Sequence, residues 1–343
     1  MAVHALQTSL ACFVLAFALA DLPIGSALSS QGVHQHKHDF KSFESEILGL
    51  SGYSVSGKVG IATTTDPWIF FSGKVSGLEA NLNSASCNTT AHANACGVHV
   101  HAGKSCAERG IHFFAGKDDV WKTVKYTSTN SLGEATFSAI LKTGVDADIV
   151  GRVFVVHNST GHQVGCGQIE ATKAVHGNLM PLSGSGVSCE VIVAKQAPNS
   201  VFGAGMCMKL EPNLQDGPNC TATNGCGAHI HSGTGCGANA QGGHYFEGST
   251  DPWGTAKYRK TNTMGHADFT FLVNSVADYG KSRPFIVHNN AGQRVACGML
   301  DNIRHISPTA SSAARAKPAF GWLCALGSSM ACFFLGVVLT TRL

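Results

Sequence analysis

Short apolar stretches separated by glycine-containing turns run through the middle of the chain. Residues 135–141 and 267–273 alternate between apolar and polar side chains with a period near two. This alternation predicts half-buried β-strands, because successive side chains of a strand point to opposite faces. Residues 153–156 and 285–287 are shorter, continuously apolar and rich in residues that favour strands. Since this part of the chain lacks a persuasive 3.6-residue apolar period, we expect an all-β fold, an antiparallel sandwich or barrel.

The chain begins with an apolar run, residues 9–20, that is too short to cross a membrane comfortably as a helix. It ends in Ala18-Leu19-Ala20, the small-residue pattern of a cleavage site. We therefore expect residues 1–20 to be a secretory signal peptide, with a polar N-terminal segment at 21–50. The alternative is a buried N-terminal helix.

A second apolar run closes the chain at residues 319–343, after a Ser/Ala-rich spacer at 305–318. A small attachment residue, a short polar spacer and an apolar tail are typical of a GPI signal. A single membrane-spanning tail is the alternative. Both predict a cell-surface protein whose body is extracellular and whose C-terminus anchors it to the membrane.

Composition narrows the class of protein. The 343 residues suffice for two domains, and 44% are hydrophobic while only 13% are charged. This excludes a disordered chain, which needs low hydrophobicity and high charge. A formal net charge of +3 without a Lys/Arg run argues against nucleic-acid binding.

The cysteine count fits secretion. Of 13 cysteines, Cys12 lies in the expected signal peptide, and Cys324 and Cys332 lie in the C-terminal tail. Ten remain between them, an even number that predicts disulfides in an oxidising compartment. Glycosylation sequons at Asn88, Asn158 and Asn219 agree with this location.

The same motif occurs twice, at offsets of 130 to 132 residues, so the chain contains two homologous domains. We expect domain 1 at 51–172, a linker at 173–182 and domain 2 at 183–304. The matched segments are Cys96–Cys106 with Cys226–Cys236, Gly110–Phe114 with Gly242–Phe246, Asp119–Trp121 with Asp251–Trp253, Arg152–Asn158 with Arg283–Asn289, and Gly165–Gly167 with Ala296–Gly298.

Histidines recur within this motif in a pattern that predicts a metal site. His99 and His101 are two residues apart in an expected strand, which places both imidazoles on one face. His112 and His157 recur in register and complete a set of four; imidazole ligands without carboxylate or thiolate suit copper or zinc. For a single histidine, a hydrogen-bonded polar role would be the better interpretation. The set in the second domain is His229, His231, His244 and His288.

The remaining histidines have no such support. His162, His176 and His266 are unmatched between the domains, and we expect them at the surface. The alternating histidines at 34, 36 and 38 could bind metal weakly, but their polar surroundings favour a solvated tail.

The order His-x-His, Cys, His, Arg-x-x-x-Val-His and Cys-Gly resembles the copper/zinc superoxide dismutase family, over nearly the whole of each domain. The resemblance implies two tandem Greek-key β-barrels, each with copper held by four histidines. It also implies disulfides from the active-site loop to the last strand, Cys106–Cys166 and Cys236–Cys297. We further pair Cys189 with Cys207, Cys87 with Cys96 and Cys220 with Cys226, although spacing alone leaves the connectivity open.

The chain departs from that family where zinc would bind. Family members carry further histidines and an aspartate in a long loop after the third copper ligand. The 44 residues between His112 and His157 contain no histidine, and His266 is the single one between His244 and His288. We expect copper, one ion per repeat, and no zinc. The charged guiding loop before the last cysteine is also missing, as in copper-only superoxide dismutase-repeat proteins, which this chain resembles.

Without zinc, another group must orient His112 and His244. Asp119 and Asp251 each follow seven residues after that histidine and could accept its second N–H. The alternative is that each only turns the chain before the tryptophan that follows it.

The resemblance implies that the domains differ in activity. An arginine three residues before the last cysteine attracts superoxide in the family; Arg294 stands there in domain 2 and Gln163 in domain 1. We therefore expect domain 2 to be the more active. The resemblance also implies that His112 and His244 leave the reduced metal and carry a proton. Arg152 and Arg283 recur in a strand motif and are expected to be structural.

Three functions follow from these observations. The first is an enzyme that converts superoxide to oxygen and hydrogen peroxide. The second is a surface protein that sequesters or hands on copper without turnover. The third is an adhesive or structural ectodomain that kept only the fold, and two intact histidine sets count against it.

Overall fold

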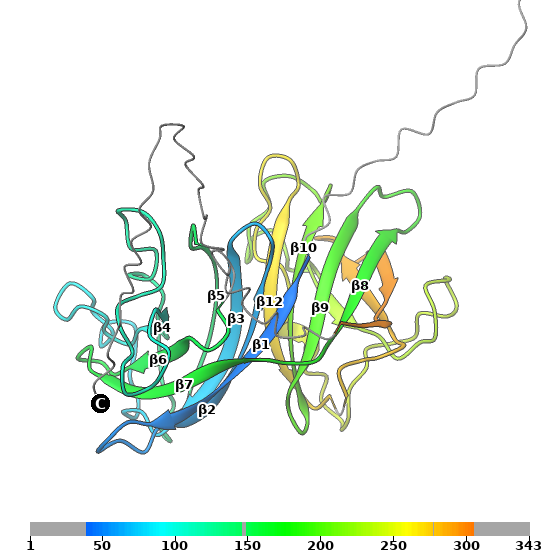
Figure 1. The fold of residues 1–343 in the computed structure, drawn as a ribbon. Helices are drawn as coiled ribbons and strands as arrows, with labels where there is room; N and C mark the ends of the chain where they lie inside the picture. Colours follow the sequence, from blue (N-terminus) through cyan, green and yellow to red (C-terminus); the bar gives the residue numbers. More distant parts are fainter. Residues whose placement is uncertain (1–38, 146–148, 277, 305–343) are drawn as a thin grey trace, which may run out of the picture. The chain divides into compact units, whose positions relative to one another are not determined.

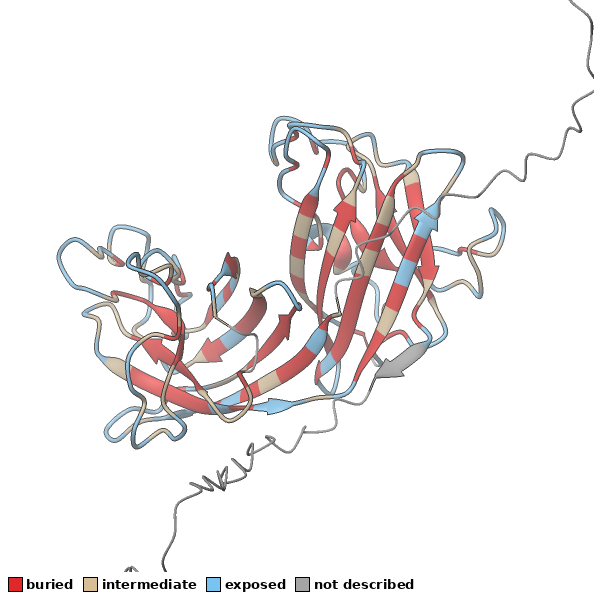
Figure 2. Ribbon diagram, turned by 45° about the horizontal axis from the view of Figure 1, so that its top comes forward, coloured by how far each residue is buried: buried red, intermediate tan, exposed pale blue. Residues whose placement is uncertain are grey.

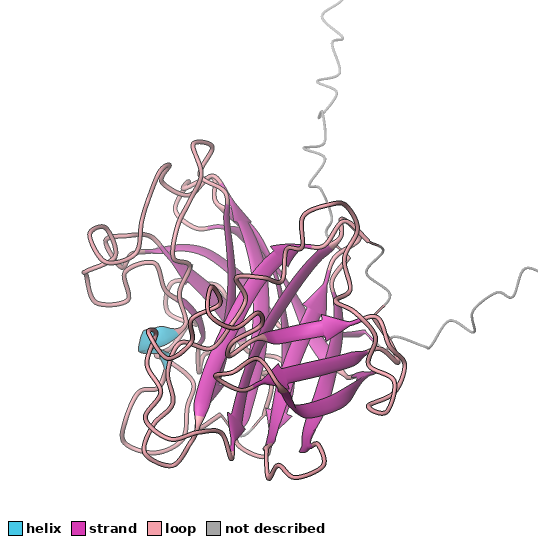
Figure 3. Ribbon diagram, turned by 90° about the vertical axis from the view of Figure 1, so that its left-hand side faces the viewer, coloured by secondary structure: helices cyan, strands magenta, loops and turns pink. Residues whose placement is uncertain are grey.

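The computed structural model describes residues 39–145, 149–276 and 278–304. Strands dominate this part of the chain, with one short 3-10 helix, η1 (Trp253–Thr255) (Figure 3). No helix among the described residues has the length and apolar character needed to cross a membrane. The expected signal peptide, the histidines at 34, 36 and 38, and the C-terminal spacer and tail lie outside the described residues.

The first repeat forms a seven-stranded antiparallel sheet (Figure 1). The connection from β3 to β4 runs from the strand next to one end of the strand order to the opposite end, and the connection from β4 to β5 runs back across the whole order. Along the sheet the strands are β4 (Val98–His101), β6 (Val153–His157), β7 (Gln163–Ala171), β1 (Lys41–Gly49), β2 (Ser56–Thr63), β3 (Trp68–Ser76) and β5 (Ala135–Lys142).

The second repeat has the same strand order in its own sheet, which confirms an all-β fold of two tandem antiparallel units. A short additional strand, β15 (Asn302–Arg304), pairs with β8 at the end of the repeat. The order is β11 (Ala228–Ile230), β13 (Pro284–His288), β14 (Arg294–Met299), β8 (Ala174–Pro181), β9 (Ser188–Ala197), β10 (Ser200–Met208) and β12 (Ala267–Asn274).

The four strands expected from the apolar pattern are present as β5, β6, β12 and β13. Along β5, buried and more exposed residues alternate, as the period of two predicts. By contrast, every residue of β6 and β13 is buried, which explains why these strands are continuously apolar. Figure 2 shows the buried residues of the strands in red.

The repeats begin earlier than the sequence analysis expected. Residues 41–49, assigned to a polar N-terminal segment, form β1. This strand pairs with β2 on one side and β7 on the other, and its Phe43 and Ile47 are buried. Residues 174–181, assigned to a linker, form β8, which pairs with β9 and β14. The buried polar residue Ser45 between Phe43 and Ile47 interrupts the apolar pattern of β1, and Pro181 with nearby Ser and Gly obscured β8. Only Thr172 and Lys173 separate the two sheets.

Aromatic residues fill the centre of each repeat. In the first, Phe71 contacts Trp121, Phe137 and Phe154 at ring-centroid distances of 5.2 to 6.2 Å. Trp253 is fully buried in the core of the second, as Trp121 is in the first. A third buried apolar cluster contains residues of both repeats, among them Phe70 and Phe202. It explains why β3 and β10 are buried on both faces.

Five disulfides cross-link the described residues, and their pairs are those given in the sequence analysis. Two of them join the loop after the His-x-His strand to the last long strand of the repeat, and three close shorter loops or pair neighbouring strands. The pairs are Cys106–Cys166, Cys236–Cys297, Cys87–Cys96, Cys220–Cys226 and Cys189–Cys207.

The glycine after the last cysteine of each repeat is needed for close strand packing. A Cβ at Gly298 would lie 2.3 Å from the carbonyl oxygen of Asn178 in β8, and one at Gly167 would lie 2.0 Å from that of Glu46. Gly298→Ala should therefore lower the free energy of unfolding by about 1–3 kcal/mol, because backbone must move to admit the methyl group. Chemical denaturation of the purified protein measures this.

Gly254→Ala is the matched control in the same repeat, because a Cβ there would meet no atom within 4 Å. We expect its stability to stay within about 0.5 kcal/mol of the parent. Equal stability of the two variants would contradict the packing argument.

Candidate metal centres

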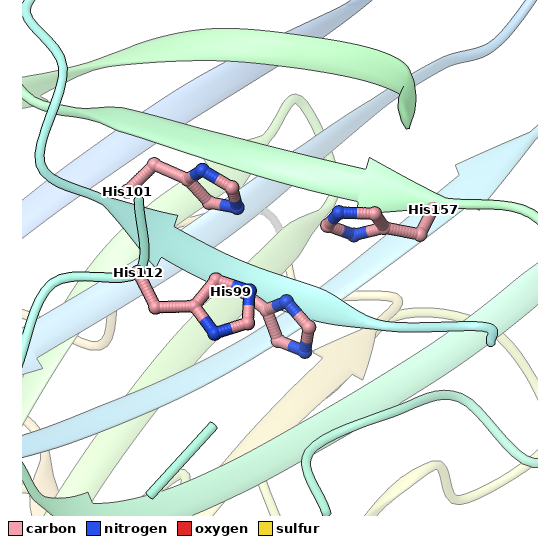
Figure 4. Close-up of side chains that lie close together, drawn as sticks. All are labelled: His99, His101, His112 and His157. Atoms are coloured by element: carbon pink, nitrogen blue, oxygen red, sulfur yellow. The ribbon is translucent and has the colours of Figure 1, made fainter. Parts of the chain in front are cut away.

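Four histidines of the first repeat converge from three segments of the chain. His99 and His101 come from β4, and His157 ends the neighbouring strand β6. His112 lies in the loop after β4 and is held beside His101 by an isolated antiparallel bridge. Figure 4 shows the rings of His101 and His157 turned toward each other, with the rings of His99 and His112 beside them.

Each of these histidines offers one nitrogen to a common point. The four candidate ligand atoms lie within 4.8 Å of one another. Imidazole nitrogens sit about 2.0–2.1 Å from a bound transition metal, so a shared ion needs nitrogens no more than about 4.2 Å apart. A small inward movement of the rings is enough to bring all four to one ion.

Hydrogen bonds on the outer side of the rings fix which nitrogen faces inward. His99 Nε2 donates to the carbonyl oxygen of Val124 at 3.0 Å, and His101 Nδ1 donates to that of Gly110 at 2.9 Å. His157 Nδ1 lies 3.2 Å from the carbonyl oxygen of Gly97. A carbonyl can only accept, so these nitrogens carry the hydrogen and the opposite nitrogens have free lone pairs.

The inward nitrogens have no hydrogen-bond partner among the described residues. In the first repeat they are Nδ1 of His99 and Nε2 of His101 and His157. Burial, followed by the charges that neighbouring histidines would carry, lowers the pKa of His99 to about 2. Burial likewise lowers the pKa of His157 to about 3 and that of His101 to about 4. The rings are therefore neutral at physiological pH, the form that binds a metal ion.

The second repeat reproduces this arrangement. Its four candidate ligand atoms also lie within 4.8 Å of one another, and each lacks a hydrogen-bond partner among the described residues. Burial lowers the pKa of His229 to about 2 and that of His231 to about 3. His288 differs in detail, because its Nδ1 lies 2.9 Å from the carbonyl oxygen of Gly292. His244 is bridged to His231 as His112 is to His101.

Asp119 and Asp251 contact the loop histidines and also turn the chain. His112 Nδ1 lies 2.7 Å from Oδ2 of Asp119, and His244 Nδ1 lies 2.5 Å from Oδ2 of Asp251. The other carboxylate oxygen of each accepts the backbone N–H of the tryptophan two residues later, at 2.9 Å. The two interpretations of these aspartates therefore describe one interaction, in which the turn aims the carboxylate at the histidine.

Glycines before the His-x-His strands leave room for the first histidine. A Cβ at Gly97 would lie 2.4 Å from Cε1 of His99, and one at Gly227 would lie 2.3 Å from Cε1 of His229. The histidine ring therefore lies over a glycine in both repeats. Any larger residue there would displace the ring from the group.

A matched pair of tyrosines supports the histidines and was not expected from the sequence. Tyr126 donates its hydroxyl to the carbonyl oxygen of His157 at 2.9 Å, and Tyr258 does the same for His288 at 3.1 Å. Both tyrosines are buried, and burial raises the pKa of each. Their repetition at an offset of 132 residues was the signal available in the sequence.

The repeated arginines of the strand motif are half-buried and stack on aromatic rings, which agrees with the expected structural role. The guanidinium of Arg152 lies 3.6 Å from the ring centroid of Phe113 and donates to the carbonyl oxygen of Ala102 at 2.7 Å. Arg283 makes the equivalent stacking contact with Tyr245, at 3.7 Å.

Arg294 and Gln163 each lie opposite the last histidine of their repeat. Arg294 pairs with His288 across β13 and β14, and Gln163 pairs with His157 across β6 and β7. Each contacts a residue of the loop after the His-x-His strand: Arg294 donates to Gln241, and Gln163 accepts from Arg109. Neither loop residue was expected from the sequence.

The three unmatched histidines lie outside both groups. His162 and His266 are exposed, and His176 is half-buried in β8. This agrees with the expectation for His162 and His266, whereas His176 is part of a strand that had been assigned to the linker.

The chain matches no protein-family model and no curated protein. Among solved structures it is similar to a mutant of superoxide dismutase 5 from Candida albicans, with 15% identity, a TM-score of 0.28, and coverage of 38% of this chain and 92% of that one. It is also similar to the clock protein EA4, with 15% identity, a TM-score of 0.28, and coverage of 40% and 99%. Similarities this distant assign no function, so the function must be argued from the histidine groups.

The hydroxyl of Tyr126 should contribute measurably to the stability of the first repeat. Tyr126→Phe leaves the carbonyl oxygen of His157 without a buried donor, which should lower the free energy of unfolding by about 1–2 kcal/mol. Denaturant titration of the copper-free protein measures the difference. Tyr53→Phe, at an exposed tyrosine, is the control, and a Tyr126→Phe variant as stable as this control would show that the bond contributes nothing.

Proposed function

We propose that this chain is an extracellular superoxide dismutase of the copper/zinc superoxide dismutase superfamily that uses copper alone, with one four-histidine copper site in each repeat. The observation that carries the proposal is the pair of matched histidine groups, each with buried nitrogens that lack partners and are turned to one point. Unpartnered buried polar atoms are costly, and a bound metal ion removes that cost.

The donor set supports copper. All four donors of each group are imidazole nitrogens, which suit copper and zinc among the common metals. The outer hydrogen bonds to backbone carbonyls and to an aspartate hold the rings in one orientation, as is usual for histidines that ligate a metal. The ligands of each site would be His99, His101, His112 and His157 in the first repeat, and His229, His231, His244 and His288 in the second.

The reaction transfers one electron between two superoxide ions. The first superoxide gives up an electron and leaves as oxygen; the second takes up an electron and two protons and leaves as hydrogen peroxide. Bound copper supplies a centre that stores the electron between these two events.

The protein's own residues would move one of the protons. Asp119 accepts the N–H of His112 at Nδ1, so Nε2 is the atom that faces the site. Nε2 would be a metal ligand while the ring is bound and would carry a proton to the site when the ring is released. His244 and Asp251 are arranged in the same way in the second repeat. The second proton comes from water. The side chains of His112 and His244 are 10% and 11% exposed, so water reaches these two rings.

Two intact sites support activity in both repeats. The expectation that the second repeat is the more active depended on a neutral residue, Gln163, where the second repeat has Arg294. Arg109 lies against Gln163 and brings a cation to the first repeat as well. The charge near the site therefore gives no reason to expect different activities in the two repeats.

The disulfides support an extracellular location. All ten cysteines of the described residues are paired, which is typical of proteins folded in an oxidising compartment. A GPI anchor at the C-terminus, with a membrane-spanning tail as the alternative, completes the proposal.

One observation favours a second function, copper binding without turnover. Three of the four histidines in each group are only 1–2% exposed, so a small anion reaches the site from one side only. A site that binds copper but excludes superoxide would sequester the metal. Copper binding without superoxide removal would identify this function.

Protein purified from cells that express the full chain should bind two copper ions per chain and remove superoxide without added zinc. His101→Ala and His231→Ala should each reduce bound copper to one ion per chain, because each variant loses a ligand of one site. Metal analysis and the rate of superoxide decay measure both properties. A chain that binds no copper would contradict the proposal, and so would one whose activity requires zinc.

Asp119 should strengthen copper binding in the first repeat. Asp119→Asn replaces the carboxylate that holds His112 and should weaken copper binding at that site by about 10- to 100-fold, as loss of such partners does elsewhere. Competition with a chelator of known affinity measures the change. Asp118→Asn is the control, because Asp118 is the exposed neighbour and has no counterpart in the second repeat. Equal effects of the two substitutions would show that the contact with His112 is not what matters.

A further inference from the structure

The two repeats carry the same arginine–glutamine pair with the two residues exchanged. Arg109 of the first repeat corresponds to Gln241 of the second, because both make the same backbone hydrogen bond. The carbonyl oxygen of Arg109 accepts from the N–H of Gly103 at 2.8 Å, and that of Gln241 accepts from the N–H of Gly233 at 3.1 Å. In the strand that faces this loop, Gln163 corresponds to Arg294. The second repeat thus has its arginine on the strand, and the first has it on the loop.

The side chains make equivalent contacts in the two arrangements. Arg109 Nε donates to Oε1 of Gln163, and Arg294 Nη1 donates to Oε1 of Gln241 at 2.8 Å. The loop residue, whichever type it is, also donates to the carbonyl oxygen of the first disulfide cysteine. Arg109 makes this bond to Cys106, and Gln241 makes it to Cys236.

The two arginines lie beside equivalent histidines. Arg109 contacts Gln163, which pairs with His157 across β6 and β7, and Arg294 itself pairs with His288 across β13 and β14. Arg294 also donates to the carbonyl oxygen of Gly242, which lies 3.1 Å from His231 Nδ1. Both guanidiniums are half-buried and so keep a solvent-facing part.

We propose that Arg109 is the anion-attracting residue of the first copper site, in the role expected of Arg294 at the second. A cation beside a recessed site raises the local concentration of small anions, and its effect depends on where the charge lies and not on which segment of the chain carries it. This inference rests on the proposed function, since it concerns the approach of superoxide. It replaces the prediction that the first repeat is the weaker because of Gln163.

The test isolates each site within the full chain. A parent with His231→Ala and His288→Ala keeps only the first site, and copper analysis must give one ion per chain. In this background we compare Arg109→Gln, Arg109→Lys and the exchanged double variant Arg109→Gln/Gln163→Arg. Lys41→Gln is the charge-matched control, since Lys41 is exposed at the start of β1. The reciprocal parent, His101→Ala and His157→Ala, carries Arg294→Gln.

Two quantities are measured at low and at high ionic strength. The first is the dissociation constant of azide, a small anion, from the copper(II) protein, followed by absorbance. The second is the second-order rate constant for superoxide removal. Arg109→Gln should weaken azide binding and slow superoxide removal by about 5- to 10-fold at roughly 10 mM salt, and the difference should shrink at about 0.3 M salt.

The other variants separate charge from structure. Arg109→Lys should keep most of the parent's azide affinity, and the exchanged double variant should return to within about twofold of the parent, because both restore the charge. Lys41→Gln should match the parent. Arg294→Gln should show the same salt-dependent loss at the second site.

Several outcomes would overturn the inference. One is unchanged azide affinity in Arg109→Gln at low salt with one copper bound. Another is a loss that is equal at both salt concentrations and is not recovered by the double variant, which would show a structural role for Arg109. Azide binding that depends on Arg109 in a protein without superoxide removal would uphold the inference and refute the proposed function. A parent that binds no copper would refute both.

Discussion

The orientation of two groups of four imidazoles, each group with three buried rings and one half-buried ring, is the constraint on which the rest of the structure depends. In each repeat the ligand atoms of four rings lie within 4.8 Å of one another, and hydrogen bonds on the outer side of the rings direct free lone pairs inward. Each unpartnered buried nitrogen costs about 1–3 kcal/mol, so the group destabilises the metal-free fold. A metal ion that binds the folded state alone reverses this cost, which couples metal binding to folding.

The scaffold around the histidines is correspondingly rigid. The outer acceptors are mostly backbone carbonyls of the loops that flank β4 and β11, and these loops are closed by disulfides. Cys96 and Cys226 hold the left-handed backbone conformation, with φ of 58° and 61°, directly before the glycine that makes room for the first histidine ring. The cross-link, the turn and the glycine thus act together at the start of each His-x-His strand.

The sequence predicted the metal-binding residues best, because there the histidines coincide with the period of two of a strand and with the internal repeat. The paired histidines could be found because a period of two places His99 and His101 on one face, and the repeat selects His112 and His157 from the other histidines. β1 was missed because its buried residues, Phe43 and Ile47, are separated by polar ones that pack little apolar surface. The apolar cluster shared by the two repeats could not be predicted either, because a residue such as Phe202 reads as core of its own sheet in any pattern analysis.

The first repeat has arginine on the loop (Arg109) and glutamine on the strand (Gln163), whereas the second has glutamine on the loop (Gln241) and arginine on the strand (Arg294). A comparison of the two repeats at the strand position alone therefore suggests a missing charge that the loop position supplies. Each arrangement keeps one guanidinium and one amide in contact, with the guanidinium donating to the amide oxygen. Two arginines at these places would put two like charges side by side, and two glutamines would leave the site without a cation. The pair, and not either residue, is therefore the unit that the site requires. A change on the strand is compensated by a change on the loop because the electric field at the site depends on where the charge lies.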